Sequence, residues 1–102
     1  MIYIVAILTA FPGKMDTLLS EFKQNAVTVR QEDGCMQYEP VKDIDGGPEM
    51  LAKSGPDTFM VLEQWASREA AEAHAASAHM ASYAKRVTEL LFSRVIYALR
   101  SA

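Results

Sequence analysis

The spacing of apolar residues switches repeatedly between a strand-like and a helix-like period along this chain of 102 residues. Residues 1–11 form an unbroken apolar and β-branched run ended by Pro12-Gly13, which is typical of a buried strand. From residue 14 to about residue 32, apolar side chains recur three and four positions apart, which predicts a helix stopped by Asp33-Gly34. The apolar stripe of this helix comprises Met15, Leu18, Leu19, Phe22, Ala26 and Val29.

The second half of the chain repeats this alternation. Residues 35–43 and 58–66 indicate two further strands, and Ser67 is suited to cap the helix that follows. Helical spacing continues from residue 79 to about residue 92, and residues 93–100 alternate as a last strand. The order β-α-β-β-α-β predicts a single domain over residues 1–102 with an α+β, ferredoxin-like sandwich fold. The Gly- and Pro-rich segment 44–56 exceeds an ordinary hairpin turn, so we expect a mobile flap or a swapped arm over the pocket.

Two of the predicted strands are apolar on both faces. In the first strand, Ile2 and Ile4 point one way while Tyr3 and Val5 point the other, and residues 59–65 repeat this pattern. Helices of such a fold cover one sheet face only, so a monomer would expose an unusually large apolar patch. We therefore expect a homodimer in which two sheets pack face to face, the alternative being a loop folded over the open face.

Composition excludes several classes of function. The net charge of −3 leaves no basic stripe for a nucleic-acid backbone. No apolar run approaches the roughly 20 residues that cross a membrane, and no basic segment marks a signal peptide, so a cytoplasmic protein without membrane contact is expected. The single Cys35 has no partner thiol for a disulfide or a metal site.

Most side chains suited to chemistry lie in the segment FMVLEQWASREAAEAHAASAHM, residues 59–80. This segment, the preceding GCMQYEP and the following SAHMASY together resemble the antibiotic biosynthesis monooxygenase superfamily, most closely its bacterial quinol monooxygenases. The resemblance spans essentially the whole chain. It implies a dimeric ferredoxin-like α+β barrel with a small pocket between sheet and helices in each subunit. It further implies oxygenation of a quinol or dihydroxy-aromatic molecule by O2, with no metal, flavin or haem cofactor.

His74 and His79 are the candidates for a catalytic base. A quinol becomes an electron-rich anion only when a base removes a phenolic proton, whose pKa is ordinarily about 10. The anion can then pass an electron to O2 directly, provided that the pocket excludes bulk water and holds the ring still. His79, at the start of an inward-facing helical stripe, is the preferred base and His74 the reserve, with a structural role open for either.

The candidate substrate-binding residues surround these histidines in the predicted fold. Trp65 offers a flat wall for an aromatic ring, or alternatively a core anchor at the strand end. Glu63 shares its strand face, and burial would raise the pKa of its carboxyl and let it orient a histidine. Tyr38 and Tyr83 can hydrogen-bond a substrate oxygen. Asn25 lies near the apolar stripe of the first helix, unless it is simply exposed.

Other functions remain open. An isomerase of a small phosphorylated sugar, in the same superfamily, shares the EAH helix and the later histidine but would need Arg or Lys in its pocket. A non-catalytic dimer that binds a small aromatic ligand would have the same fold. Haem-degrading relatives carry an Asn in the first strand and a His in the last helix, where this chain has Ala6-Ile7-Leu8 and Tyr83.

Overall fold

The computed structural model describes all residues 1–102. The elements in chain order are β1 (Ile2–Ala10), α1 (Met15–Val29), β2 (Cys35–Val41), β3 (Thr58–Trp65), α2 (Arg68–Ala75), α3 (Ala78–Val87) and β4 (Leu91–Leu99). The predicted α+β class with four strands is confirmed. No helix is long and apolar enough to span a lipid bilayer.

The four strands form one antiparallel sheet in the order β2-β3-β1-β4. Leu8 of β1 lies opposite Phe59 of β3 on one side and Arg94 of β4 on the other. Because side chains alternate along a strand, this register places all three on the face that carries the helices. Ile7 is paired with Met60 and Val95, which share the opposite face.

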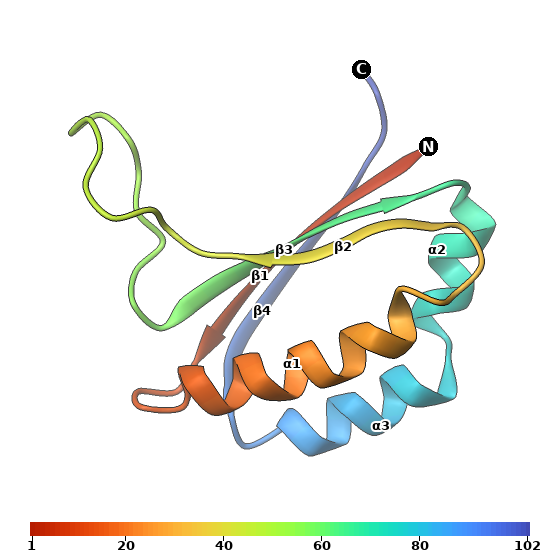
Figure 1. Ribbon diagram of the computed structural model, residues 1–102, viewed down its shortest axis with the longest axis horizontal. Coiled ribbons are helices and arrows are strands. Elements are labelled where there is room, and N and C mark those ends of the chain that lie inside the picture. The colour runs from red at the N-terminus through yellow and green to blue at the C-terminus, as the bar shows by residue number, and fades with distance from the viewer.

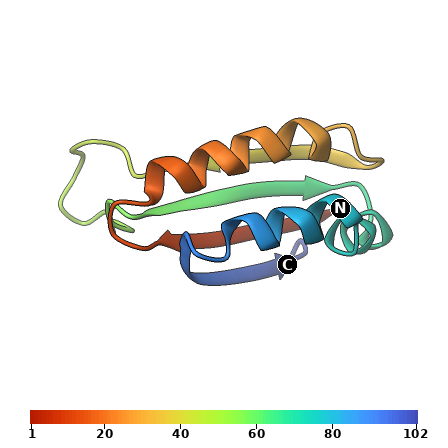
Figure 2. The same cartoon turned by 90° about the horizontal axis from the view of Figure 1, so that it is seen from below.

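All three helices cover the same face of the sheet (Figure 1). In Figure 2, which looks onto these helices, α1 lies in front of β2, α3 in front of β1, and β4 forms a free edge. The core between the layers contains Leu18, Phe22, Phe59, Val61 and Trp65, each almost completely buried. α1 and α3 are joined by a hydrogen bond from the Asn25 amide to Met80 Sδ and by an ion pair between Arg86 and Glu21.

The other sheet face has no cover within the chain. β4 contributes Val95, Tyr97 and Leu99 to it, with 45%, 51% and 46% of their surfaces exposed, and β1 contributes the exposed Tyr3. The exposed Tyr3 agrees with the two-sided apolar pattern predicted for β1, and β4 adds apolar side chains to the same open face. The homodimer itself stays a prediction.

The second helical region differs from the expected boundaries. It is broken into α2 and α3 because the Ser77 hydroxyl caps a new helix by accepting from Met80 N–H, while it donates to the carbonyl of His74. The predicted helix to residue 92 is also too long, since α3 ends at Val87 and Leu91 already pairs with Ala10 of β1. Apolar spacing alone could not separate a last helical turn from the start of a strand.

The loop between β2 and β3 is tied to itself. The Asp43 carboxylate accepts hydrogen bonds from the backbone N–H groups of Ser54 and Gly55 and from the Ser54 hydroxyl. Lys53 Nζ donates to the carbonyls of Ile44 and Gly46. Figures 1 and 2 both show the loop projecting from the end of the molecule opposite α2, so it does not cover the cavity described below.

Candidate active site

A cavity of about 720 Å³ opens between the helix face of the sheet and helices α2 and α3. Of its 24 lining residues, 18 are hydrophobic, so its few polar groups determine how a ligand would be oriented. The larger polar or hydroxyl-bearing side chains in this lining are Tyr38, Glu63, His74, Tyr83 and Arg94.

His74 forms part of the cavity wall and is 6% exposed. The Ser67 hydroxyl starts α2 by accepting from Ala70 N–H, and His74 follows two turns later on the buried side of this helix. Its Nδ1 is 2.9 Å from a Glu32 carboxylate oxygen. Burial lowers the pKa of His74, the Glu32 carboxylate opposes this effect, and His79 adds to the lowering.

Glu32 joins the two histidines. It lies in the turn between α1 and β2, and its second carboxylate oxygen contacts Nε2 of His79. Gly34 allows this turn to lie against α2, since its φ is +79° and an added Cβ would lie 2.7 Å from the Cβ of Ala70. Nδ1 of His79 is enclosed without a hydrogen-bond partner.

Trp65 and Glu63 support the site from β3. The Trp65 indole is fully buried, stacks on His74 with ring centroids 4.6 Å apart, and donates from Nε1 to Glu63 at 3.0 Å. The structure thus places Trp65 behind His74 and not among the residues that line the cavity. Burial raises the pKa of Glu63, the Trp65 hydrogen bond opposes this, and the Glu32 charge adds to it. Glu63 bonds the indole, whereas the carboxylate that contacts the histidines is Glu32.

Both predicted tyrosines line the cavity. Tyr38 of β2 packs edge-on to His74, with ring centroids 5.4 Å apart, and burial raises the pKa of its hydroxyl far above the ordinary value. Burial, aided by the charge of Glu21 and opposed by Arg86 and Arg94, raises the pKa of Tyr83 to about 12. Both hydroxyls therefore keep their protons at neutral pH and can donate hydrogen bonds.

Two further predicted site residues, besides Trp65, lie outside the cavity lining. His79, the preferred base, contacts Glu32 from the far side and has 27% of its side chain exposed. Asn25 is buried between α1 and α3, where its amide donates to Met80.

Two residues of the site were missed by reading the sequence. The position of Glu32 could have been predicted from the strand order. The start of one strand and the end of its antiparallel neighbour lie side by side at the same end of the sheet. Cys35 pairs with Trp65, so an acid three residues before Cys35 had to lie near the EQW end of β3. Arg94 was overlooked because the strand containing it appeared mainly apolar, yet it faces the cavity.

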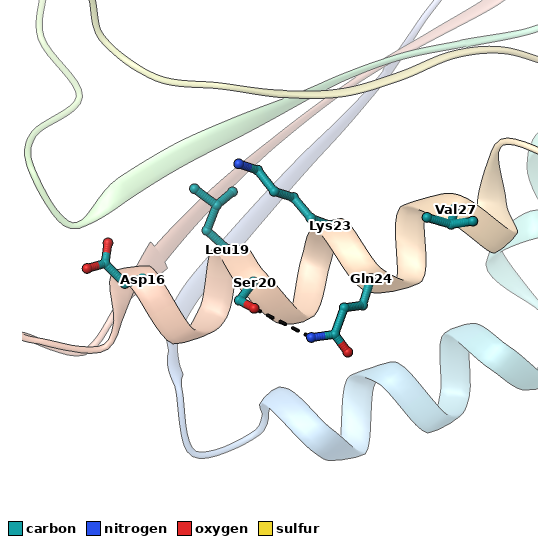
Figure 3. A pocket seen from close by; sticks show the side chains of 6 residues that line it. All are labelled: Asp16, Leu19, Ser20, Lys23, Gln24 and Val27. Carbon is teal, nitrogen blue, oxygen red and sulfur yellow. Dashed lines mark hydrogen bonds between the residues drawn. The ribbon is translucent and has the colours of Figure 1, made fainter.

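Other potential sites are less developed. No set of three or more His, Cys, Asp and Glu side chains is arranged to hold a metal ion. A second hollow of about 500 Å³ lies on the outer side of α1 and is bordered by residues of that helix alone (Figure 3). Its polar groups include Asp16, Lys23 and a Gln24–Ser20 hydrogen bond of 3.5 Å, all at the surface.

Comparison with known proteins assigns the chain to a family. The antibiotic biosynthesis monooxygenase family matches residues 1–86. This chain belongs to that family. The "Probable quinol monooxygenase YgiN" of Escherichia coli strain K12 is 32% identical over 89 residues, which cover 85% of each protein. Membership in the antibiotic biosynthesis monooxygenase family, expected from the sequence, is thereby confirmed and supports a monooxygenase-type enzyme.

Solved structures share the fold of this chain. PA3566 from Pseudomonas aeruginosa superposes with a TM-score of 0.80 at 27% identity, covering 99% of this chain and 94% of that one. Rv0793 from Mycobacterium tuberculosis also gives a TM-score of 0.80, at 24% identity with 99% and 94% coverage, and shows the shared fold alone.

Proposed function

We propose that this protein is an oxidoreductase that oxygenates a quinol or another dihydroxy-aromatic molecule with O2, without a metal, flavin or haem. The observation that carries the proposal is the placement of His74, a buried imidazole backed by a carboxylate on the wall of a largely apolar cavity. The likeness to a probable quinol monooxygenase supports the substrate class. A cytoplasmic location remains an expectation from the sequence.

His74 is suited to remove the phenolic proton. His74 Nε2 has no hydrogen-bond partner within the protein. It is not enclosed, since His79 Nδ1 is the only buried side-chain nitrogen or oxygen that lacks a partner. Because His74 lines the cavity, we take its Nε2 to be open to the cavity. Because burial lowers the pKa of His74, its imidazole is neutral at pH 7 and can accept a proton. The adjacent Glu32 carboxylate stabilises the imidazolium that results.

The deprotonated quinol supplies the electrons for O2. In monooxygenation, one oxygen atom enters the ring and the other leaves as water, so quinol and O2 give a hydroxyquinone and H2O. When no oxygen enters the ring, the same reactants give the quinone and H2O2. The apolar lining favours either course because it holds the ring and O2 together and limits access of water.

Three further side chains are placed to hold the substrate oxygens. The protonated hydroxyls of Tyr38 and Tyr83 can donate to a quinolate oxygen, and the Arg94 guanidinium can balance its charge. The Trp65 indole acts through His74 in this proposal, since the cavity is lined by the histidine.

Arg94 also favours a second candidate function. An isomerase of a small phosphorylated sugar needs a cation for the phosphate, and Arg94 supplies one at the cavity wall. The mostly apolar lining favours the aromatic substrate instead. A non-catalytic aromatic-binding protein would use the same cavity without turnover.

We also propose that the working unit is a homodimer formed through the open sheet face. Val95, Tyr97 and Leu99 present a continuous apolar strip on that face of β4. Burial of such a strip against a second copy would remove exposed apolar area from water.

The decisive test is O2 consumption by metal-stripped protein given a reduced quinol. We expect uptake above the autoxidation blank, with ¹⁸O from labelled O2 in the product for a monooxygenase or H2O2 for an oxidase. His74→Asn is the matched variant, because its amide can still donate to Glu32 from the Nδ1 position but lacks the base at Nε2. We expect kcat to fall by about 10²- to 10⁴-fold.

Failure would take distinct forms. Uptake equal to the blank, with the Trp65 emission still changed by the quinol, would favour the binding protein. Conversion of a sugar phosphate without O2 would favour the isomerase. If a folded His74→Asn variant kept full kcat while His79→Ala lost rate, His79 and not His74 would be the catalytic base.

A further inference from the structure

The Glu32 carboxylate is divided between two imidazoles. One oxygen lies 2.9 Å from Nδ1 of His74 on α2, and the other contacts Nε2 of His79 on α3. The side chains of Glu32 and His74 are 19% and 7% exposed, so the contact is shielded from solvent. The turn after α1 and the two consecutive helices α2 and α3 thus meet at one carboxylate.

This arrangement assigns the ring protons. An ionised carboxylate only accepts hydrogen bonds, so each nitrogen that contacts Glu32 must carry a hydrogen. When neutral, His74 then holds its proton on Nδ1 and presents a lone pair at Nε2 to the cavity. His79 holds its proton on Nε2, and its lone pair at Nδ1 is enclosed by protein.

The two histidines are consequently unequal. The His74 lone pair can reach a cavity ligand, whereas the enclosed lone pair of His79 cannot. A histidine without a strong acceptor at Nδ1 usually carries its proton on Nε2, which would leave no base facing the cavity. Something must hold His74 in the other tautomer, and Glu32 is the only hydrogen-bond partner of its Nδ1.

We infer that Glu32 is the positioning residue of this site, holding His74 in the Nδ1–H tautomer with Nε2 free, while His79 anchors the second oxygen of Glu32. The inference deepens the proposed quinol oxidation and rests on it for its kinetic consequences. His79 is then a second positioning residue, which acts on His74 only through the carboxylate.

The surroundings set the pH response. The groups facing the cluster are His79 from α3, Glu63 from β3, and Tyr38 and Cys35 from β2. The Glu32 charge is what opposes the lowering of the His74 pKa by burial. Removing that charge therefore moves the protonation of His74 to lower pH.

Nuclear magnetic resonance of ¹⁵N-labelled imidazoles in the unmodified protein tests the tautomers without any substrate. When both rings are neutral, we expect His74 to be protonated at Nδ1 and His79 at Nε2. Glu32→Ala, which removes the acceptor, should move His74 toward the Nε2–H form, and Glu32→Gln, which removes only the charge, should shift the titration of His74 to lower pH. Glu49→Gln removes an identical charge from the exposed loop and should change neither. A predominant Nε2–H form of His74 in the unmodified protein would overturn the inference.

Kinetics provide the second test. In Glu32→Gln we expect kcat to fall by about 100-fold with little change in KM, and the acidic limb of the pH profile to move down. His79→Gln, which keeps an N–H donor at the Nε2 position, should retain most of kcat, whereas His79→Ala should not. Unchanged kcat and pH profile in a folded Glu32→Gln variant would refute the positioning role and leave quinol oxidation standing. If the unmodified protein oxidises no quinol, the proposed function fails and the tautomer measurement still decides on Glu32.

Discussion

The indole of Trp65 stacks on the imidazole of His74, with ring centroids 4.6 Å apart and 28° between the ring planes. Trp65 is the only tryptophan in the chain and is fully buried. The protein therefore contains a built-in optical probe beside the histidine to which we assign proton transfer.

We predict that Trp65 emission reports the protonation of His74. A protonated imidazole in contact with an indole quenches its fluorescence, and burial lowers the pKa of His74 from the ordinary 6.5. Emission should therefore fall as the pH drops, with a midpoint below 6.5. The measurement is a fluorescence titration, with circular dichroism to verify that the fold persists. The same transition in His74→Asn would assign the quenching to another group.

Replacing Glu63 by glutamine should stabilise the protein at neutral pH. Burial raises the pKa of Glu63, so the folded state holds this proton more tightly than the unfolded state does. The stability associated with the protonated form is then lost as pH rises from the ordinary pKa of 4.5 through the raised one. An amide remains neutral and still accepts from Trp65 Nε1.

Urea unfolding at two pH values checks this expectation. Glu63→Gln should have the larger free energy of unfolding at pH 7, and the difference should shrink well below pH 4.5. The exposed Glu49→Gln should show no such pattern. A variant less stable than the unmodified protein at pH 7 would mean that ionised Glu63 contributes net stability.

Gly34→Ala should destabilise the fold more than Gly13→Ala. Both glycines have a φ of +79°, but a Cβ at Gly13 meets no atom within 4 Å, whereas one at Gly34 lies 2.7 Å from Ala70. We expect about 1 kcal/mol from the backbone strain in each variant and roughly 1–3 kcal/mol more from the clash at Gly34.

The free energy of unfolding in urea is measured for each glycine variant alone and combined with Ala70→Gly. The departure from additivity gives the coupling energy between the two positions, which isolates the clash. Only the Gly34 variant should regain stability from the second change. If Gly34→Ala and Gly13→Ala lost the same free energy of unfolding, the turn could move away from α2 without loss of stability.

Val95→Lys should dissociate the proposed homodimer. Val95 is 45% exposed on the open sheet face, and a lysine there would place a charge in the interface. Val27, which is 59% exposed on α1, is the matched control because the helix side takes no part in this interface. Sedimentation should give a dimer for the unmodified protein and for Val27→Lys, and a monomer for Val95→Lys. A monomer of about 11.3 kDa in all three would contradict the dimer.

Local patterns predicted the parts of the fold that rest on burial. The stripe from Met15 to Val29 is helical because one face must enter the core, and the apolar runs of β1 and β3 are extended because their helix-facing side chains are buried. The break at Ser77 was missed because a capped interruption leaves apolar spacing nearly unchanged.

The site was only partly predictable, because apolar periodicity locates side chains on helices and strands but not those in turns. His74, Tyr38, Glu63 and Tyr83 lie on regular elements whose register can be inferred, and all four line the cavity. Glu32 lies in a turn, where no periodicity indicates the direction of a side chain. Its partners come from α2 and α3, and their approach to the turn depends on the missing Cβ of Gly34.

The two walls of the cavity differ in how well they tolerate amino-acid substitutions. One wall contains the enclosed cluster around His74, where a substitution would disturb several packed neighbours at once. The other includes Ser93, Arg94 and Ile96 of β4, all exposed at the edge of the sheet, where replacements usually alter folding energy little. Descendants of this chain can therefore drift toward new ligands through β4 while the proton-handling groups are inherited unchanged, which makes this strand the natural starting point for directed evolution of substrate range.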